Sequence, residues 1–267
     1  LNFILANLPI IRQMCLLEIV SARVKPAGAA CPPEPRAMDT GTAVSPGGRR
    51  RAGATSDDTQ SVTVLIPTRN ERGNIAAALE RLPRFGSHQE IMFVDGHSTD
   101  GTLEEIERQA AEHPEMDIRW FTQDGKGKGD AVRKGFANAK GDILMILDAD
   151  LTVPPEELPK FYDAIVEGKG EFINGSRLVY PMEDRAMRFL NVLGNKFISV
   201  VFTWLLDQRF KDTLCGTKVL TRENYAKVAA GRHYFGDFDP FGDFDLIFGA
   251  AKLNLKITEV PIRYRER

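Results

Sequence analysis

The sequence predicts an α/β fold in which a mostly parallel sheet carries helices on both faces. From Val62 onward, short apolar runs alternate with longer segments of helical period, the pattern of parallel strands joined by crossover helices. The run DILMILDA at 142–149 is almost continuously hydrophobic, as expected of a strand that helices cover on both sides. We therefore expect this run to be the central strand.

Each expected element has a local reason. The strands are short runs rich in β-branched and aromatic residues, whereas the helices repeat apolar residues every three or four positions. The expected strands are VTVLIP at 62–67, EIMFVD at 90–95, DIRWFTQ at 117–123, DILMILDA at 142–149 and EFINGS at 171–176. The expected helices are 74–82, 102–113, 129–139 and 155–168.

The first part of the chain differs from the rest. Residues 1–20 are apolar, but proline and charged residues interrupt them, which leaves no uncharged run of about 18 residues to span a bilayer. They also lack the basic start of a signal peptide. Residues 25–60 are rich in Pro, Gly, Ala, Ser and charge without periodicity. We expect 1–60 to be a disordered or spurious leader and 61–267 to be one domain with a truncated C-terminus.

Composition narrows the classes of function. The formal net charge of -2 and the pI near 6.2 provide no overall field that would gather nucleic acid, so we expect no nucleic-acid partner. Three cysteines, Cys15, Cys31 and Cys215, lie far apart and fit neither a disulfide framework nor a zinc site. We expect a reducing, cytoplasmic location rather than secretion.

Polar segments follow all five expected strands, and these are the candidate binding positions. In open α/β sheets, ligands bind outside the carboxyl ends of the strands. The segments are PTRNE at 67–71, DGHSTDGT at 95–102, DGKGKGD at 124–130, DADLT at 148–152 and GSR at 175–177.

Asp148 and Asp150 form the most informative of these segments. Two carboxylates at i and i+2 on an extended segment point to the same side and can reach one divalent ion. Mg²⁺ or Mn²⁺ held in this way completes its shell with substrate phosphates and can neutralise a diphosphate leaving group. The alternative is a solvated turn that caps the helix expected near Pro154. Their place at the end of the most buried strand favours the metal site.

The other two loops allow more than one interpretation. Asp95 either hydrogen-bonds a ligand base or belongs to a tight turn before the helix at 102–113. The glycine-rich loop at 124–130 fits neither a Walker motif nor GxGxxG, which disfavours kinases, GTPases and dinucleotide enzymes. It remains a cationic loop in which Lys128 either contacts phosphate or is solvated.

Six motifs in order resemble the inverting family 2 glycosyltransferases of the GT-A fold. They are VLIPTRNERGNI, FVDGHSTDGT, GKGKGDAVRKG, GDILMILDADL, NGSR and DTLCGTKVL. The similarity is to the branch that contains dolichol-phosphate mannosyltransferase and bacterial polyprenyl-phosphate glycosyltransferases, and it covers about residues 62–265. It implies a UDP- or GDP-sugar donor and a membrane-bound lipid-phosphate acceptor.

The resemblance also assigns roles to individual residues. It implies a donor pocket formed by Pro67, Thr68, Asn70, Glu71, Asp95, Lys128 and Asp148, with Asp95 on the base. It implies that Asp148 and Asp150 hold the metal and the diphosphate, which makes Asp150 a catalytic residue. It places the acceptor phosphate at Arg177, Arg188 and Asn195.

The pattern of polar residues in the segment 185–210 allows contact with a lipid membrane, and this indication does not depend on the resemblance. Its polar residues recur every three or four positions and form one narrow stripe on an otherwise apolar helix. Such a helix is buried in the core, rests on a membrane or forms a dimer interface. The polar positions are Arg188, Asn191, Asn195, Ser199 and Thr203.

Asp243 decides between two acceptor classes. The resemblance makes it the best match for the general base of family members with hydroxyl acceptors, although it equally suits the start of the helix DFDLIFGAAKL. A hydroxyl must lose a proton as it attacks, whereas a lipid phosphate is already ionised. We therefore expect a metal-dependent inverting glycosyltransferase, peripheral at the inner face of the membrane, that uses a polyprenyl phosphate. The alternatives are a hydroxyl acceptor with Asp243 as base, a nucleotidyltransferase, and a non-enzymatic nucleotide-sugar-binding module.

Overall fold

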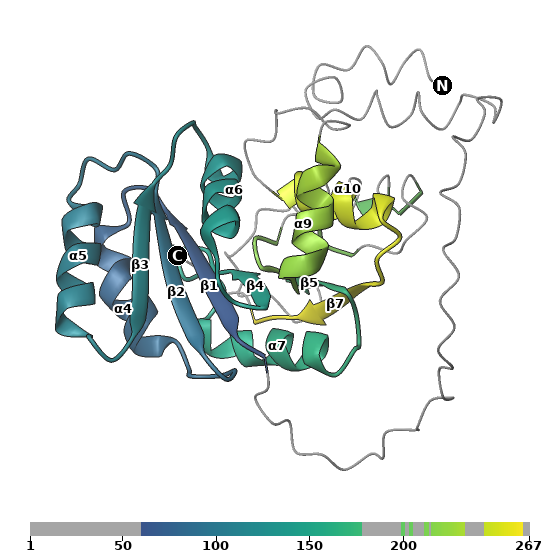
Figure 1. Ribbon diagram of the computed structural model, residues 1–267, viewed down its shortest axis with the longest axis horizontal. Coiled ribbons are helices and arrows are strands. Elements are labelled where there is room, and N and C mark those ends of the chain that lie inside the picture. Colours follow the sequence, from purple (N-terminus) through teal and green to yellow (C-terminus); the bar gives the residue numbers. More distant parts are fainter. Residues whose placement is uncertain are drawn as a thin grey trace, which may run out of the picture. The chain divides into compact units, whose positions relative to one another are not determined.

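The computed structural model describes residues 60–177, 199–200, 203–204, 211–213, 215–232 and 243–263, which belong to one compact unit (Figure 1). The first strand begins at Val62, one residue after the expected domain start. Residues 1–59 lie outside the described part, so the expected leader stays a prediction.

Seven strands form one mixed sheet in the order β3-β2-β1-β4-β6-β5-β7. Their bounds are β1 Val62–Thr68, β2 Gln89–Asp95, β3 Asp117–Thr122, β4 Ile143–Ile146, β5 Phe172–Ser176, β6 Lys218–Thr221 and β7 Ile257–Pro261. The pairs β1·β2, β2·β3, β1·β4 and β5·β7 are parallel, and β6 runs antiparallel to both β4 and β5. The apolar strand β4 is the middle strand of the seven, which confirms the expectation from its hydrophobicity.

Strand β6 was not among the expected strands. It spans only Lys218–Thr221, which is too short to show a clear period, and it inserts between β4 and β5. The Thr221 side chain then accepts a hydrogen bond from the backbone N–H of Asn224 and caps the helix that follows. One polar residue thus ends the strand and starts the helix.

Helices cover both faces of the sheet, as expected (Figure 1). The bounds are η1 Arg72–Asn74, α4 Ile75–Arg81, α5 Thr102–Glu112, α6 Lys128–Asn138, η2 Pro155–Glu157, α7 Leu158–Val166, α9 Arg222–Ala230 and α10 Asp243–Lys252. Helices α4, α5 and α7 pack on the face that carries Val64, Ile66 and Phe93. Helix α6 packs on the other face at Gly135, where an added Cβ would lie 2.3 Å from Leu65 Cδ1. Only glycine allows the helix to approach β1 this closely.

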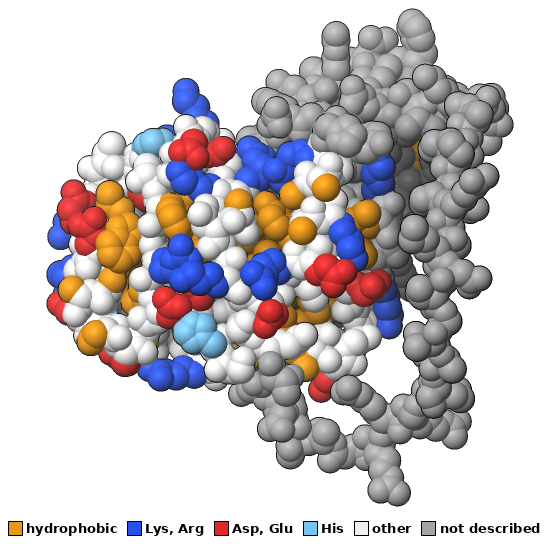
Figure 2. Space-filling view, viewed as in Figure 1, with side chains coloured by type: hydrophobic (Ala, Val, Ile, Leu, Met, Phe, Trp, Pro, Cys, Tyr) orange, Lys and Arg blue, Asp and Glu red, His pale blue; other side chains and the backbone are white. Residues whose placement is uncertain are grey.

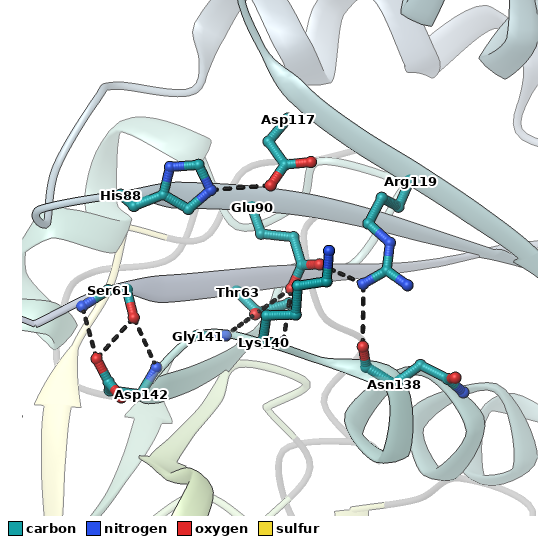
Figure 3. A network of polar contacts seen from close by, with 10 residues as sticks. All are labelled: Ser61, Thr63, His88, Glu90, Asp117, Arg119, Asn138, Lys140, Gly141 and Asp142. Carbon is teal, nitrogen blue, oxygen red and sulfur yellow. Dashed lines mark hydrogen bonds and ion pairs between the residues drawn. The ribbon is translucent and has the colours of Figure 1, made fainter.

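A polar network joins the amino ends of the strands (Figure 3). The carboxylate of Glu90, 1% exposed, accepts hydrogen bonds from Thr63 Oγ1 at 2.6 Å and from the backbone N–H of Lys140 at 2.9 Å. Arg119 Nη1 lies 2.6 Å from the other carboxylate oxygen. The hydroxyl of Thr63 also accepts the backbone N–H of Gly141 at 2.9 Å. Glu90 therefore fastens β1, β2, β3 and the connection from α6 to β4.

The surface charges and the helix lengths can be compared with what nucleic-acid binding and membrane spanning require. Acidic and basic side chains are interspersed with apolar ones over the described part of the face in Figure 2. Within the described ranges, no helix is both long and apolar enough to cross a bilayer.

Candidate functional site

A cavity of about 360 Å³ opens at the carboxyl edge of the sheet, beside the ends of β1 to β4 and the start of α6. This is the edge at which open α/β sheets bind ligands. The lining residues are Pro67, Thr68, Arg69, Glu71, Gly96, Gln123, Gly127, Lys128, Ala131, Asp148, Ala149 and Asp150. Five of the predicted donor residues, Pro67, Thr68, Glu71, Lys128 and Asp148, are therefore brought together here.

Asp148 and Asp150 enter the cavity from a tight turn after β4. The backbone N–H of Leu147 donates to the carbonyl of Leu65 on β1 at 2.9 Å. The N–H of Leu151 then donates to the carbonyl of Asp148 at 3.1 Å, which closes the turn. Ala149 between them is 5% exposed. Asp150 Oδ1 accepts hydrogen bonds from the N–H and hydroxyl of Thr152, at 3.1 and 2.9 Å. The two acids therefore build a turn and also line the cavity. Neither caps the helix that follows, because Pro154 and Glu157 occupy the N-cap positions of η2 and α7 without a side-chain cap. The capping alternative is therefore wrong, and the metal site stays a prediction.

Lys128 meets Asp148 across the cavity. Its Nζ lies 2.5 Å from Asp148 Oδ1, and the two side chains are 24% and 27% exposed. Gly127, at φ 84°, introduces α6 and turns the chain so that Lys128 becomes the first helical residue. Asp130 braces the same loop, because its Oδ2 accepts the backbone N–H of Gly125 at 2.7 Å.

Gly216 completes this junction from a third segment. A Cβ at this position would lie 1.9 Å from Asp148 Oδ2 and 2.6 Å from Lys128 Nζ. The backbone of the segment that leads into β6 therefore rests directly on the ion pair. Gly216 belongs to the motif DTLCGTKVL, but the sequence predicts no role for it, since the contact joins residues far apart in the chain.

The carboxylates at this edge can be tested as ligands of a divalent ion. Mg²⁺ is commonly held by one or two carboxylates and completes its shell with substrate phosphates and water. Asp148 and Asp150 supply two such groups beside a cavity large enough for a diphosphate. No group of three or more His, Cys, Asp or Glu side chains gathers among the residues that the structure describes. These residues fit a two-carboxylate site that phosphate oxygens complete.

Asn70 and Asp95 brace the loops instead of lining the cavity. Asp95, 3% exposed, accepts hydrogen bonds from the N–H and hydroxyl of Ser98, at 3.0 and 2.5 Å. Asn70 Oδ1 accepts the backbone N–H of Thr99, and its own N–H donates to Ser98 Oγ, both at 2.9 Å. Asn70 has φ 57°, a conformation that asparagine tolerates well. The predicted contact of Asp95 with a base stays a prediction.

Arg177 is engaged by a buried acid. Its Nε and Nη2 donate to the two carboxylate oxygens of Asp212 at 2.8 and 2.9 Å, and its backbone N–H donates at 3.0 Å. The side chain of Asp212 is fully buried and that of Arg177 is 13% exposed. Glu259 accepts the backbone N–H groups of Lys211 and Asp212, and burial raises the pKa of its carboxyl. The segment that carries Asp212 is thus anchored to β7.

Cys215 lies near Arg177 and Asp212, and its thiol is expected to be unreactive. Burial raises the pKa of its thiol to about 11, so it is protonated at neutral pH. Gly175 on β5 leaves room for the sulfur, because a Cβ there would lie 2.4 Å from Cys215 Sγ. The nearby ammonium of Lys218, itself fully buried, donates to the carbonyl of Cys215.

The remaining predicted site residues are only partly placed. Arg188 and Asn195 lie outside the described residues. Asp243 is the first residue of α10, as its alternative interpretation as a helix start expected. Two ion pairs of Asp245 hold this helix: its Oδ2 lies 2.9 Å from Arg232 Nε and 3.8 Å from Arg133 Nη1 on α6.

Arg69 and Gln123 line the cavity but were not among the predicted site residues. Gln123 follows β3, and its N–H donates to the carbonyl of Asp95 at 2.9 Å. Arg69 stands inside the quoted segment PTRNE. The strand-end rule contained the signal for both, since each comes directly after a strand.

A model of the family described as "Glycosyl transferase family 2" matches residues 63–225. Glycosyltransferase AglJ of Haloferax volcanii is 31% identical over 208 residues, which cover 78% of this chain and 64% of that protein. A dolichol-phosphate mannosyltransferase of Pyrococcus furiosus is 40% identical over 120 residues, which cover 44% of this chain and 33% of that protein. The chain therefore spans less than two thirds of the length of either relative.

Among solved structures, glucosyl-3-phosphoglycerate synthase from Mycobacterium tuberculosis, in complex with Mn²⁺, UDP and glucosyl-3-phosphoglycerate, superposes with a TM-score of 0.58. The match covers 82% of this chain and 78% of the other at 17% sequence identity. The likeness shows the fold, which is GT-A, as the motif order predicted.

Proposed function

Because the chain belongs to glycosyl transferase family 2, we propose that it moves a sugar from a nucleoside-diphosphate sugar to a polyprenyl phosphate with inversion of the anomeric centre. The observation that carries this proposal is the cavity at the carboxyl edge of the sheet. There Asp150 and the ion pair of Asp148 with Lys128 line the same cavity, so carboxylates for a cation and an ammonium for phosphate share one space.

The donor occupies this cavity in the proposed reaction. Thr68 and Glu71 line its β1 side, and Lys128 offers its ammonium to the diphosphate. Asp148 and Asp150 hold a Mg²⁺ or Mn²⁺ ion, which when bound stabilises the charge of the departing nucleoside diphosphate. The backbone of β4, buried along its whole length, keeps both carboxylates in fixed positions.

A phosphate acceptor fits the polar groups near this edge. A lipid phosphate is ionised at neutral pH and needs cations that position it, not a base that deprotonates it. Arg177 directly follows β5, and Asp212 fixes the plane of its guanidinium group through two parallel hydrogen bonds. We propose that Arg177, together with Arg188 and Asn195, binds the acceptor phosphate. The relative from P. furiosus is named for dolichol phosphate, which supports this class of acceptor.

Four helical positions support contact with a membrane surface. Ser199 and Thr203 belong to the polar stripe of the segment 185–210, and Ser199 is 4% exposed with its hydroxyl bonded to the carbonyl of Lys211. Val200 and Trp204, one turn apart, are 68% and 66% exposed. Ser199 thus faces the protein, whereas Val200 and Trp204 face outward, an arrangement suited to the interfacial region of a bilayer. We propose a peripheral enzyme at the cytoplasmic face.

The test is the release of nucleoside diphosphate from a panel of UDP- and GDP-sugars with Mg²⁺ or Mn²⁺, each with and without polyprenyl phosphate. We expect release from one donor, stimulated by the lipid. Pyrophosphate release from a nucleoside triphosphate and a sugar phosphate would identify a nucleotidyltransferase instead. Absence of turnover with every donor would favour a module that only binds nucleotide sugars.

Asp243→Asn separates the two acceptor classes within the same assay. With a phosphate acceptor no general base is required, so we expect turnover within about threefold of the unmodified protein. With a hydroxyl acceptor the loss should reach about 10² to 10⁴-fold, the usual contribution of a general base. A loss of that size would overturn the choice of a polyprenyl phosphate.

A further inference from the structure

The ion pair between Lys128 and Asp148 uses the same carboxylate that a divalent ion would use. Lys128 Nζ contacts Oδ1 at 2.5 Å, and Oδ2 lies against the backbone of Gly216. Both oxygens of Asp148 therefore have close neighbours. A cation that binds Asp148 therefore competes with the ammonium group for its oxygens.

The charges determine what this displacement costs. A divalent ion that arrives alone at Asp148 places a dication beside the ammonium of Lys128 in a partly buried cavity, where like charges repel more strongly than in water. An ion that arrives with a nucleoside diphosphate brings phosphate oxygens that accept the ammonium. In the second case the negative phosphate oxygens offset the repulsion between the ammonium group and the metal ion.

We infer that Lys128 is an internal counter-ion that blocks Asp148 against a metal ion alone and yields it to the metal only when a diphosphate is present. The inference rests on the proposed function, because it assigns the diphosphate of a nucleotide sugar to this cavity. Its consequence is positive coupling between metal and nucleotide. By linkage, each ligand raises the affinity for the other by the same factor.

A second lysine of the same helix provides a matched control. Lys134 Nζ lies 2.6 Å from Asp124 Oδ1, so this is also a lysine–aspartate ion pair, and its distance is close to that between Lys128 and Asp148. Neither residue lines the cavity, and the side chain of Asp124 is 80% exposed. Lys134→Met therefore removes one positive charge from α6 without affecting Asp148.

The experiment is a titration of the full chain with Mn²⁺, followed by electron paramagnetic resonance of the free ion, with and without UDP or GDP. We expect the unmodified protein to bind Mn²⁺ weakly alone and more tightly with the nucleotide. Lys128→Met should bind Mn²⁺ alone at least about fivefold more tightly, the lower end of typical coupling, and the gain from nucleotide should shrink. Lys134→Met should match the unmodified protein.

One outcome would overturn the inference about Lys128 alone, and another would overturn the proposed function as well. If Lys128→Met binds Mn²⁺ alone no more tightly than the unmodified protein and keeps its full gain from nucleotide, the inference is wrong while the proposed function stands. If the unmodified protein binds no Mn²⁺ with either nucleotide, the proposed function fails as well. Lys128→Gln should reproduce the shift of Lys128→Met, and thermal unfolding of each variant verifies the fold.

Discussion

Two short ion pairs lie at opposite edges of one sheet and serve different ends. At the amino edge, Arg119 Nη1 lies 2.6 Å from Glu90, and at the carboxyl edge, Lys128 Nζ lies 2.5 Å from Asp148. The acid of the first pair is 1% exposed and that of the second is 27% exposed. The distances are nearly equal, so the pairs differ in their surroundings and not in the separation of their charges.

The surroundings decide the role. Glu90 receives hydrogen bonds from Thr63 and from the backbone of Lys140 in addition to Arg119, so every interaction it makes is with the protein (Figure 3). Asp148 shares its site with a cavity of about 360 Å³. A carboxylate enclosed by protein donors fastens strands, whereas one beside an open cavity can exchange its partner. The second kind of pair is a candidate for function.

Replacing Asp148 should have the largest effect on activity and little on stability. Asp148→Asn removes one of two carboxylates that would hold the metal, and we expect release of nucleoside diphosphate to fall by about 10³-fold. Steady-state release and thermal unfolding measure the two quantities. Asp124→Asn is the control, because it alters an acid that pairs with a lysine of α6 outside the cavity. Retained activity in Asp148→Asn would contradict the metal assignment.

Replacing Glu90 should show the opposite pattern. Glu90→Ala leaves Arg119 without its buried partner and strips the hydroxyl of Thr63 and the N–H of Lys140 of an acceptor. We expect the free energy of unfolding in urea to fall by about 3 kcal/mol, with unchanged turnover per folded molecule. His88→Ala, in the exposed pair with Asp117, should cost less than about 1 kcal/mol. Equal costs for the two variants would contradict the role given to Glu90.

Gly216→Ala tests whether close packing holds the second pair. The added methyl group would lie 1.9 Å from Asp148 Oδ2 and 2.6 Å from Lys128 Nζ, so one of these side chains must move. We expect kcat/KM for the donor to fall by about 10²-fold, the usual cost of displacing site groups by about 1 Å. Gly73→Ala is the control, since nothing lies within 4 Å of its added Cβ. Similar kinetics in both variants would show that the junction tolerates displacement.

Ser61→Ala should have the smallest effect and should depend on pH. The hydroxyl and N–H of Ser61 donate to Asp142, and these hydrogen bonds lower the pKa of its carboxyl below the ordinary 3.8. A lowered pKa in the folded state adds stability that is present above 3.8 and is lost as the pH falls through the folded value.

At pH 7 the variant should therefore lose less than about 1 kcal/mol, because Asp142 is half exposed. The loss should shrink in acid to the part that comes from the N–H of Asp142, which donates to the same hydroxyl. Thermal unfolding at pH 7 and in acid measures the difference. A loss that grows as the pH falls would reverse the predicted sign.

Local patterns in the sequence were sufficient for most of the first half of the fold. The five expected strands and four expected helices all exist, and Ile143–Ile146 is central as its continuous hydrophobicity indicated. These elements are long or strongly apolar, so their period is visible in the chain itself. Strand β6 is neither, and its place between β4 and β5 depends on backbone pairing that no local pattern records.

The site likewise divides into features that the sequence predicts and features that only the tertiary structure sets. The sequence by itself determined that Pro67, Lys128 and Asp148 would meet, because the carboxyl ends of parallel strands share one edge. Only the tertiary structure decided which partner each charge takes: Lys128 on Asp148, and Asp212 on Arg177. Ion pairs and the close approach of Gly216 depend on distances of a few ångströms between distant segments, and such distances are set by packing and not by spacing along the chain.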